Sequence, residues 1–314
     1  MKIALDIMGG DYAPLETTRG AIIAQKELAE QGVKLVLIGD KPSIEAIIIK
    51  DGASVNDFEI VHTTEVIGMA ESPTRAFSQK PNSSITVGFG LLKSGQVQAF
   101  ASAGNTGAML VGSVYSVKNI PGVIRPCITS LVPKVEGGYN IILDIGANAD
   151  CKPDVLYQFG ILGSLYSKYV LNVTNPKVGL LNIGEEDEKG NLVSLAAHQL
   201  MREGKDFNFV GNVESRELFN NKADVIVCDG FTGNIVLKQA EAFYDVAMRR
   251  GIKDDFFSRF NYENYGGSPI LGINSNVIVG HGISNAKAIK SMLLLSKNVA
   301  EAKLSEIINK AFND

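Results

Sequence analysis

Short apolar runs alternate with longer segments of helical periodicity along almost the whole chain. Several of the short runs are apolar without alternation, which is typical of strands buried on both faces of a parallel sheet. The pattern predicts ten strands, at Lys2–Asp6, Lys34–Ile38, Phe58–His62, Val97–Ala101, Cys127–Val132, Asn140–Asp144, Lys177–Asn182, Phe207–Val210, Asp224–Cys228 and Asn276–Val279.

Helical periodicity is clearest in two segments, the one after the first predicted strand and the one after the last. The first predicted helix is apolar along one face, with Pro14 suited to its first turn and Gly32 suited to its end. The last is expected to run as one helix through Ser284–Phe312, with Ser284 or Asn285 as its N-cap. The face of the first helix combines Leu15, Thr18, Ile22, Gln25 and Leu28.

This alternation predicts a three-layer αβα fold with a mainly parallel sheet. No internal repeat, low-complexity tract or linker interrupts the sequence, so residues 1–314 are expected to form one continuous α/β domain, either undivided or bilobed. Residues 248–267 break the pattern because they combine five aromatic side chains with mixed charges. We expect this segment to be a short arm or an interface.

Composition excludes several classes of protein. The formal net charge of −4 is unlike the basic surface typical of nucleic-acid-binding proteins. Three cysteines, Cys127, Cys151 and Cys228, have neither C-x-x-C nor metal-ligand spacing, which indicates a reduced cytoplasmic protein. The N-terminal apolar run is too short for a signal peptide, and no run approaches the roughly 20 residues that span a bilayer. The protein is therefore expected to be soluble, and free to touch a membrane surface.

The turns that follow the predicted strands share a composition of glycine and short polar residues. They are 6–11 (DIMGGD), 102–107 (SAGNTG), 144–153 (DIGANADCKP), 182–191 (NIGEEDEKGN), 229–234 (DGFTGN) and 280–282 (GHG). In open α/β sheets, ligands bind where strands end. Glycine allows close approach of the backbone to a ligand, and Asn, Ser and Thr donate hydrogen bonds. Together these turns predict a neutral, donor-rich pocket for a phosphate or an acyl-transfer oxyanion.

Other interpretations of single residues remain open. A single Gly/Asn turn is more often only a tight turn, and it is the recurrence that favours a site. His281 is either a site residue or a surface histidine, and Lys152 and Lys189 are either ligands or merely solvated. Cys151 is expected to be a packing residue rather than a nucleophile.

The sequence lacks the usual nucleotide and hydrolase motifs. It has no G-x-G-x-x-G after a strand, no G-x-x-x-x-G-K-[ST] and no G-x-S-x-G. With only three histidines a His-rich metal site is not expected, although Asp144, Asp150 and Asp229 leave a Mg²⁺ site open as an alternative. We therefore expect neither a cofactor nor a metal.

Taken in order, these turns resemble the acyl-acyl-carrier-protein:phosphate acyltransferases of bacterial glycerophospholipid synthesis, of the PlsX type. The resemblance covers essentially the whole chain and rests on the combination of stretches rather than on any one. The matching stretches are ALDIMGGDYAP (4–14), SAGNTGA (102–108), LDIGANADCKP (143–153), LLNIGEEDEKGN (180–191), DGFTGNIVLK (229–238), YGGSPILGIN (265–274) and GHGISNAKA (280–288).

The resemblance implies that phosphate attacks the thioester of a long-chain acyl-acyl-carrier protein, giving acyl phosphate. It also implies the isopropylmalate-dehydrogenase-like fold and a homodimer. A membrane acyltransferase that uses acyl phosphate to acylate glycerol 3-phosphate is an expected partner, and a peripheral position at the inner face of the membrane is an expected location. The family has a longer helical arm in the region of residues 248–267, and this chain has a shortened one. We expect the shortened arm to pack across the dimer.

Roles follow from the resemblance for residues on these turns. Lys189, Asn234 and His281 are expected to be catalytic, polarising the thioester, fixing phosphate or moving its proton. Binding of substrate is expected of Gly104, Asn105, Thr106, Asn148, Lys152, Asp11 and Gly233. The carboxylates of Asp6, Asp11, Asp144 and Asp229 are expected to organise loops, because they would repel phosphate directly.

Two rival functions remain at this point. One is an enzyme of the same fold that acts on a small acyl-coenzyme A, as phosphate butyryltransferases do. The other is a non-catalytic module that binds phosphoanions at a membrane. Phosphorolysis of long-chain acyl-carrier protein compared with acyl-coenzyme A distinguishes all three.

Overall fold

A computed structural model describes residues 1–313, and its internal contacts divide the chain into two compact units. Unit 1 comprises Met1–Asn119 and Tyr262–Ser305, and unit 2 comprises Ile120–Asn261 and Glu306–Asp314. Each unit has its own mainly parallel sheet with its own buried core, which confirms the predicted α/β class. The single domain over 1–314 stays a prediction.

The sheet of unit 1 has the order β3-β2-β1-β4-β11-β10. All neighbouring strands in it run parallel except β10 and β11, which are antiparallel. Strand β1 is almost wholly buried, as its unbroken apolar run requires. The strands are β1 Lys2–Asp6, β2 Lys34–Gly39, β3 Glu59–His62, β4 Ala99–Ser102, β10 Ser268–Leu271 and β11 Asn276–Val279.

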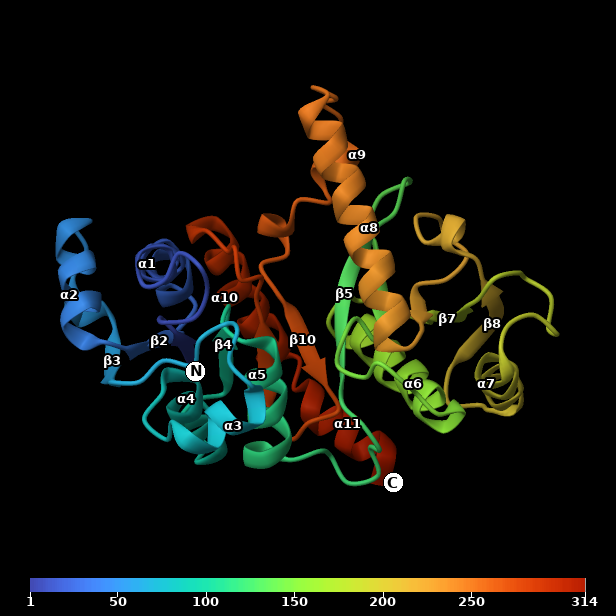
Figure 1. Ribbon diagram of the computed structural model, residues 1–314, viewed down its shortest axis with the longest axis horizontal. Coiled ribbons are helices and arrows are strands. Elements are labelled where there is room, and N and C mark those ends of the chain that lie inside the picture. Colours follow the sequence, from blue (N-terminus) through green and yellow to red (C-terminus); the bar gives the residue numbers. More distant parts are fainter. Residues whose placement is uncertain (314) are drawn as a thin grey trace. The chain divides into compact units, whose positions relative to one another are not determined.

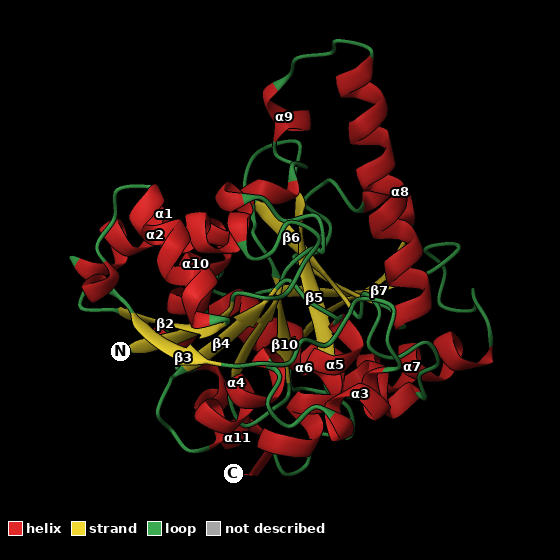
Figure 2. Cartoon of the chain, turned by 60° about the vertical axis from the view of Figure 1, so that its left-hand side comes forward, coloured by secondary structure: helices red, strands yellow, loops and turns green. Residues whose placement is uncertain are grey.

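Helices cover both faces of this sheet. Helices α1 and α10 pack against each other on one face, and α4 lies on the other (Figure 2). Gly20 makes the first contact possible, since a Cβ there would lie 2.4 Å from the Cβ of Ile289. The helices are α1 Leu15–Ala29, α2 Lys41–Lys50, α3 Pro73–Gln79, α4 Ser84–Lys93, α5 Thr106–Gly112 and α10 Ala286–Glu301, followed by α11 Leu304–Asn313, which begins at the end of unit 1.

The sheet of unit 2 has the order β5-β6-β9-β7-β8, and only the β5–β6 pair is antiparallel. Helix α6 packs on β6, β7 and β9 and against α7. Helix α8 extends beyond the strands and carries α9 near its far end (Figure 1). The elements are β5 Cys127–Pro133, β6 Tyr139–Leu143, α6 Pro153–Tyr169, β7 Lys177–Leu181, α7 Leu192–Glu203, β8 Asn208–Val213, β9 Val225–Val227, α8 Gly230–Arg249 and α9 Asp255–Ser258.

The structure contains all ten predicted strands and one that the pattern did not indicate. Strand β10 is short and contains Pro269, which argues against a strand in sequence. The prediction of one helix over Ser284–Phe312 is wrong, because α10 and α11 are separate and Lys303 between them has a φ of 52°. Of the two candidate N-caps, Asn285 is the one that accepts from the Ala288 N–H.

The aromatic segment at 248–267 packs partly on unit 2. The rings of Phe256 and Phe260 meet Phe219 edge to face, at centroid distances of 6.4 and 5.6 Å. Arg259 stacks on Tyr139, 4.7 Å from the ring centroid, and donates to the carbonyl of Lys134. Its role as an arm or interface between copies stays a prediction.

Candidate functional site

Three turns meet at one edge of the sheet in unit 1. Strands β1, β4 and β11 are parallel neighbours, so the segments that follow them leave at the same edge. The Asp11 N–H donates to the carbonyl of Gly282 at 2.7 Å. A Cβ on Gly9 would lie 2.7 Å from the backbone nitrogen of Gly104. The structure therefore brings together the predicted site residues Asp11, Gly104–Thr106 and the His281 turn.

A buried carboxylate organises this edge. Asp6 accepts a hydrogen bond from Ser102 Oγ at 2.7 Å and from the Met8 N–H at 3.0 Å. Ser102 Oγ in turn accepts from the Gly104 N–H at 2.9 Å. Burial raises the pKa of Asp6, and hydrogen bonds from Ser102 and Ser84 oppose that rise. Asp6 therefore fixes the loops, as expected, and the supporting serines had no distinct signal in the sequence.

Asn105 is buried and its side chain is fully engaged within the protein. Its Oδ1 caps α5 by accepting from the Ala108 N–H at 3.0 Å. Its Nδ2 donates to the carbonyls of Gly68, Met69 and Glu71. Thr106, the next residue, is exposed at the first position of α5. Contact between Asn105 and a substrate stays a prediction, and the contacts in the structure give its carboxamide a structural task.

His281 is exposed and lies against the ring of Tyr262, with a centroid distance of 5.4 Å. The Tyr262 hydroxyl donates to the carbonyl of Ile283 at 3.0 Å. Burial, followed by the charges of Glu263 and Tyr12, raises the pKa of Tyr262, so this hydroxyl stays a donor at neutral pH. The imidazole is thus held on the turn after β11, beside Gly282.

Unit 2 has an equivalent arrangement around Asp144. This buried carboxylate follows β6 and accepts from the N–H groups of Ile128, at 3.0 Å, and of Asn148, at 2.6 Å. It also accepts from Asn148 Nδ2 at 3.0 Å. Burial raises its pKa, and these hydrogen bonds oppose the rise. Asp144 therefore shapes the 144–148 turn, and Asn148 is held by it.

The start of α8 lies directly on this turn. The Gly230 N–H donates to the carbonyl of Asn148 at 2.7 Å, and Asn234 Nδ2 donates to the carbonyl of Ile145 at 2.9 Å. A Cβ on Gly233 would lie only 2.0 Å from the carbonyl oxygen of Asp144, so only glycine fits there. The structure thus brings together Asn148, Gly233 and Asn234.

The two predicted lysines are both exposed. Lys189 is exposed, and its carbonyl accepts from Asn182 Nδ2 within the loop after β7. Lys152 is exposed at the N-cap of α6, beside an open depression of about 490 Å³ that α7 also lines. Within residues 1–313, no hydrogen bond or ion pair joins either ammonium group to Asn148 or Asn234. Their catalytic roles stay predictions.

The two units share one local arrangement, a buried aspartate at a strand end that faces a glycine, which the sequence pattern alone did not reveal. Leu5-Asp6-Ile7 and Leu143-Asp144-Ile145 each place a buried aspartate at the end of a strand. A glycine from the turn after a neighbouring strand faces each carboxylate. An added Cβ would lie 3.2 Å from Asp6 Oδ2 at Gly104 and 2.7 Å from Asp144 Oδ2 at Gly230. The recurring L-D-I residues were the available signal.

Other chemistries find little support among the described residues. In residues 1–313, no group of three or more His, Cys, Asp or Glu side chains is placed to hold a metal ion, so Asp144, Asp150 and Asp229 do not form such a group. Burial, with the charges of Asp144 and Asp229, raises the pKa of Cys151 to about 12, so its thiol is protonated at neutral pH. None of the helices up to residue 313 combines the length and apolar character needed to cross a membrane.

Known proteins resemble this chain along its full length. The family described as "Fatty acid synthesis protein" matches residues 1–306. Proteins named phosphate acyltransferase from Dictyoglomus thermophilum and Clostridioides difficile are each 42% identical, over 98% of this chain and 96% and 95% of their own.

A solved phosphotransacetylase from Streptococcus pyogenes has the same fold, with a TM-score of 0.69 at 17% identity, over 96% of this chain and 94% of its own. These relatives overrule the non-catalytic module as an interpretation. The turns, their organising carboxylates and the match along the whole length show that this chain is an acyltransferase and belongs to the phosphate acyltransferase family.

Proposed function

We propose that this enzyme transfers a long-chain acyl group from acyl-acyl-carrier protein to inorganic phosphate, for glycerophospholipid synthesis. A phosphate oxygen attacks the thioester carbonyl carbon, a C–O bond forms and the C–S bond breaks. The products are acyl phosphate and the free thiol of the carrier protein, which takes up a proton. The membership of the family supports acyl transfer with phosphate, and the carrier-protein donor is the finer proposal.

The observation that carries this proposal is a set of glycine-rich turns fixed by the buried carboxylates Asp6 and Asp144, beside which the Cys151 thiol is protonated at neutral pH. Phosphate is itself a nucleophile, and a thiolate leaves readily. The protein therefore needs to position phosphate against the thioester and to stabilise the oxyanion. Short neutral donors held in place by a fixed backbone meet that need.

We assign roles unit by unit. In unit 1, Gly104 and Thr106 contact phosphate or the oxyanion, and His281 orients phosphate or takes its proton. In unit 2, Asn234 and Lys189 polarise the thioester or fix phosphate, with Lys152 as a second cation. Asn148 and Gly233 shape the surface from which Asn234 acts.

The test is the formation of acyl phosphate from palmitoyl-acyl-carrier protein and phosphate by the purified protein. Removal of one oxyanion donor typically costs about 3–4 kcal/mol, so Asn234→Ala should slow turnover by two to three orders of magnitude. Lys189→Ala should also lower the rate sharply, whereas Lys253→Ala, which removes an exposed lysine beyond α8, serves as the control. Rates near wild type in both Asn234→Ala and Lys189→Ala would remove the assignment.

The alternative donor is a small acyl-coenzyme A. The shared fold with a phosphotransacetylase, and with a branched-chain phosphotransacylase from Enterococcus faecalis V583 of TM-score 0.64, gives this alternative its weight. The same assay with butyryl-coenzyme A decides between them. A higher kcat/KM for the coenzyme would overturn the carrier-protein donor.

We also propose that the enzyme is a homodimer that acts in the cytoplasm, close to the membrane acyltransferase that consumes its product. Exposed apolar side chains on α8 support a contact surface there, since Phe243 and Val246 are 63% and 53% exposed. Sedimentation equilibrium tests the dimer, and a monomer at micromolar concentration would contradict it.

A further inference from the structure

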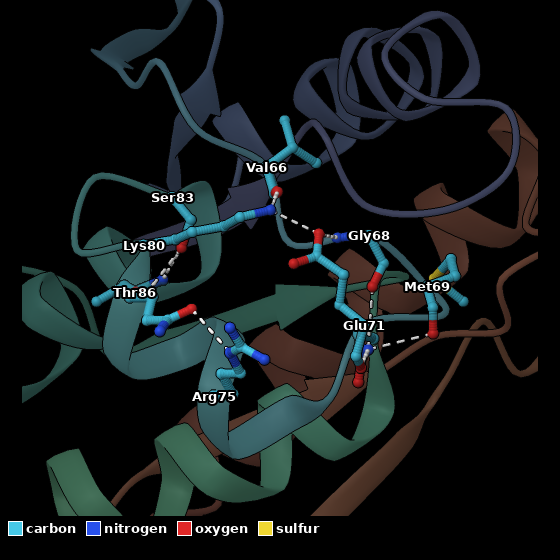
Figure 3. Close-up of polar contacts among 10 residues, drawn as sticks. Val66, Gly68, Met69, Glu71, Arg75, Lys80, Ser83 and Thr86 are labelled. Atoms are coloured by element: carbon cyan, nitrogen blue, oxygen red, sulfur yellow. Dashed lines mark hydrogen bonds and ion pairs between the residues drawn. The ribbon is translucent and has the colours of Figure 1, made fainter.

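The loop Val66–Glu71 in unit 1, called here the 66–71 loop, is held by a single buried carboxamide. Asn105 Nδ2 donates to three carbonyls of this loop, those of Gly68 at 3.1 Å, Met69 at 3.2 Å and Glu71 at 3.0 Å. Figure 3 shows these three carbonyls turned toward one point. One side chain thus bonds to three carbonyls of the loop.

A second set of contacts fixes the loop from its other end. Lys80 Nζ donates to the carbonyl of Val66 at 2.7 Å and pairs with Glu71 Oε1 at 2.5 Å (Figure 3). Glu71 Oε1 also accepts from the Gly68 N–H at 2.8 Å, and the bonded Lys80 lowers the pKa of Glu71. Ile67 is buried, so the loop is anchored by an apolar side chain as well. The loop is therefore preorganised rather than loosely attached.

Besides the paired Glu71 carboxylate, this loop exposes apolar side chains to solvent. Met69 is 46% exposed, and a Cβ on Gly282 would lie 2.8 Å from its Cε. The thioether side chain therefore lies over the turn after β11, whose Gly282 carbonyl accepts from the Asp11 N–H. Tyr12 and Ile283, next to Asp11 and Gly282 in sequence, are also largely exposed. Apolar side chains thus border the glycine-rich turns assigned to phosphate.

We propose that the 66–71 loop binds the alkyl chain of the acyl donor through Met69, and that Asn105 is a positioning residue that holds this loop rather than a ligand of phosphate. This inference rests on the proposed function. A phosphate gains nothing from a thioether, whereas an alkyl chain gains roughly fourfold in affinity for each methylene that it buries. Methionine adapts to flexible apolar ligands because its side chain is unbranched and polarisable.

The decisive variant is Asn105→Ser. Serine keeps an oxygen that can cap α5, removes the donor to the three carbonyls and adds no charge that would repel phosphate. We expect the KM for palmitoyl-acyl-carrier protein to rise about tenfold, the effect of losing roughly one net hydrogen bond, with the KM for phosphate unchanged. Lys80→Met loosens the same loop from its other end and should change the same KM in the same direction. A higher KM for phosphate in Asn105→Ser, with Lys80→Met unchanged, would overturn the proposal.

Chain length provides a readout that a merely structural role would not change. Met69→Ser should raise the KM for a palmitoyl donor several-fold and change the KM for a butyryl donor much less, because the shorter chain has fewer methylenes to bury. Ile49→Ser removes a 67% exposed apolar side chain on α2 and is the matched control. Equal effects of Met69→Ser on both donors would count against the proposal.

Hydrogen exchange of the amides in the 66–71 loop tests the positioning role without any turnover. Exchange should be faster in Asn105→Ser and in Lys80→Met than in the wild type, and unchanged exchange in both would overturn the role of Asn105. Absence of acyl phosphate with the wild-type enzyme and every donor would instead refute the proposed function. The two failures are therefore distinguishable.

Discussion

Replacing Gly233 with alanine tests how closely α8 must approach the turn that follows β6. The added Cβ would lie 2.0 Å from the carbonyl oxygen of Asp144 and 2.8 Å from Sγ of Cys228. Neither atom is the end of a flexible side chain, so the helix or the turn has to move. Asn234, the next residue on α8, would move with it and lose its 2.9 Å hydrogen bond to the carbonyl of Ile145.

The magnitude follows from three contributions. Overpacking of a buried site costs about 1–3 kcal/mol, and contact with backbone places Gly233→Ala at the upper end. Alanine returns about 1 kcal/mol through its higher helix propensity. Loss of the Asn234 hydrogen bond costs about 1 kcal/mol. We therefore expect the free energy of unfolding to fall by about 3 kcal/mol, combining these opposing effects.

The assay is urea denaturation followed by far-ultraviolet circular dichroism, since the chain has no tryptophan. Gly90→Ala in α4 is the matched control, because a Cβ there meets nothing within 4 Å. It should raise stability by up to about 1 kcal/mol and leave acyl phosphate formation unchanged. In Gly233→Ala the rate should fall along with stability. Wild-type stability and rate in this variant would refute the reasoning about the approach of α8.

Three further predictions follow from the buried carboxylates and the thiol. The carboxylate of Asp144 only accepts hydrogen bonds, and Asp144→Asn would place an N–H donor against one of its N–H partners. The free energy of unfolding, measured by thermal denaturation, should therefore fall by about 3 kcal/mol. An unchanged melting temperature would contradict this. Burial raises the pKa of Asp6 above its ordinary 3.8, so the folded state binds the Asp6 proton more tightly than the unfolded state does. The contribution of Asp6 to stability should therefore be complete below pH 3.8 and decline as pH rises through the raised pKa of the folded state. Asp6→Asn should remove this decline from urea midpoints measured against pH, and an identical pH profile would contradict the assignment. Because its pKa is about 12, Cys151 should react with iodoacetamide at neutral pH at least about a hundredfold more slowly than free cysteine, as measured by mass spectrometry, and Cys151→Ser should remain active.

Local patterning was sufficient for most of the architecture. Strand β1 has the unbroken apolar run Ile3-Ala4-Leu5, so its burial on both faces was visible in sequence. Strand β10 was not visible, because it is short and Pro269 removes a donor. The break before α11 was equally hidden, since Lys303 adopts its positive φ without a glycine or proline to signal it.

In the candidate site, the positions of the turns were predictable from the sequence and the partners of their side chains were not. The turns at 102–107 and 229–234 were predicted because glycine and short polar residues after a strand are a local signal. What each side chain does there was not predictable, because the partners are distant in sequence. Asn105 bonds to carbonyls 34 to 37 positions earlier, and Asn234 bonds to one 89 positions earlier.

The sequence by itself determined the α/β class, the ten strands and the family of turns at their ends, since these depend on periodicity and on residues close along the chain. Only the tertiary structure decided that Asn105 is bonded to the 66–71 loop, and that Lys152 lies beside a depression that α7 also lines. The physical reason is that hydrogen bonds and close packing depend on distances of a few ångströms between atoms. Those distances are fixed by the packing of whole strands and helices, and no window of sequence contains them.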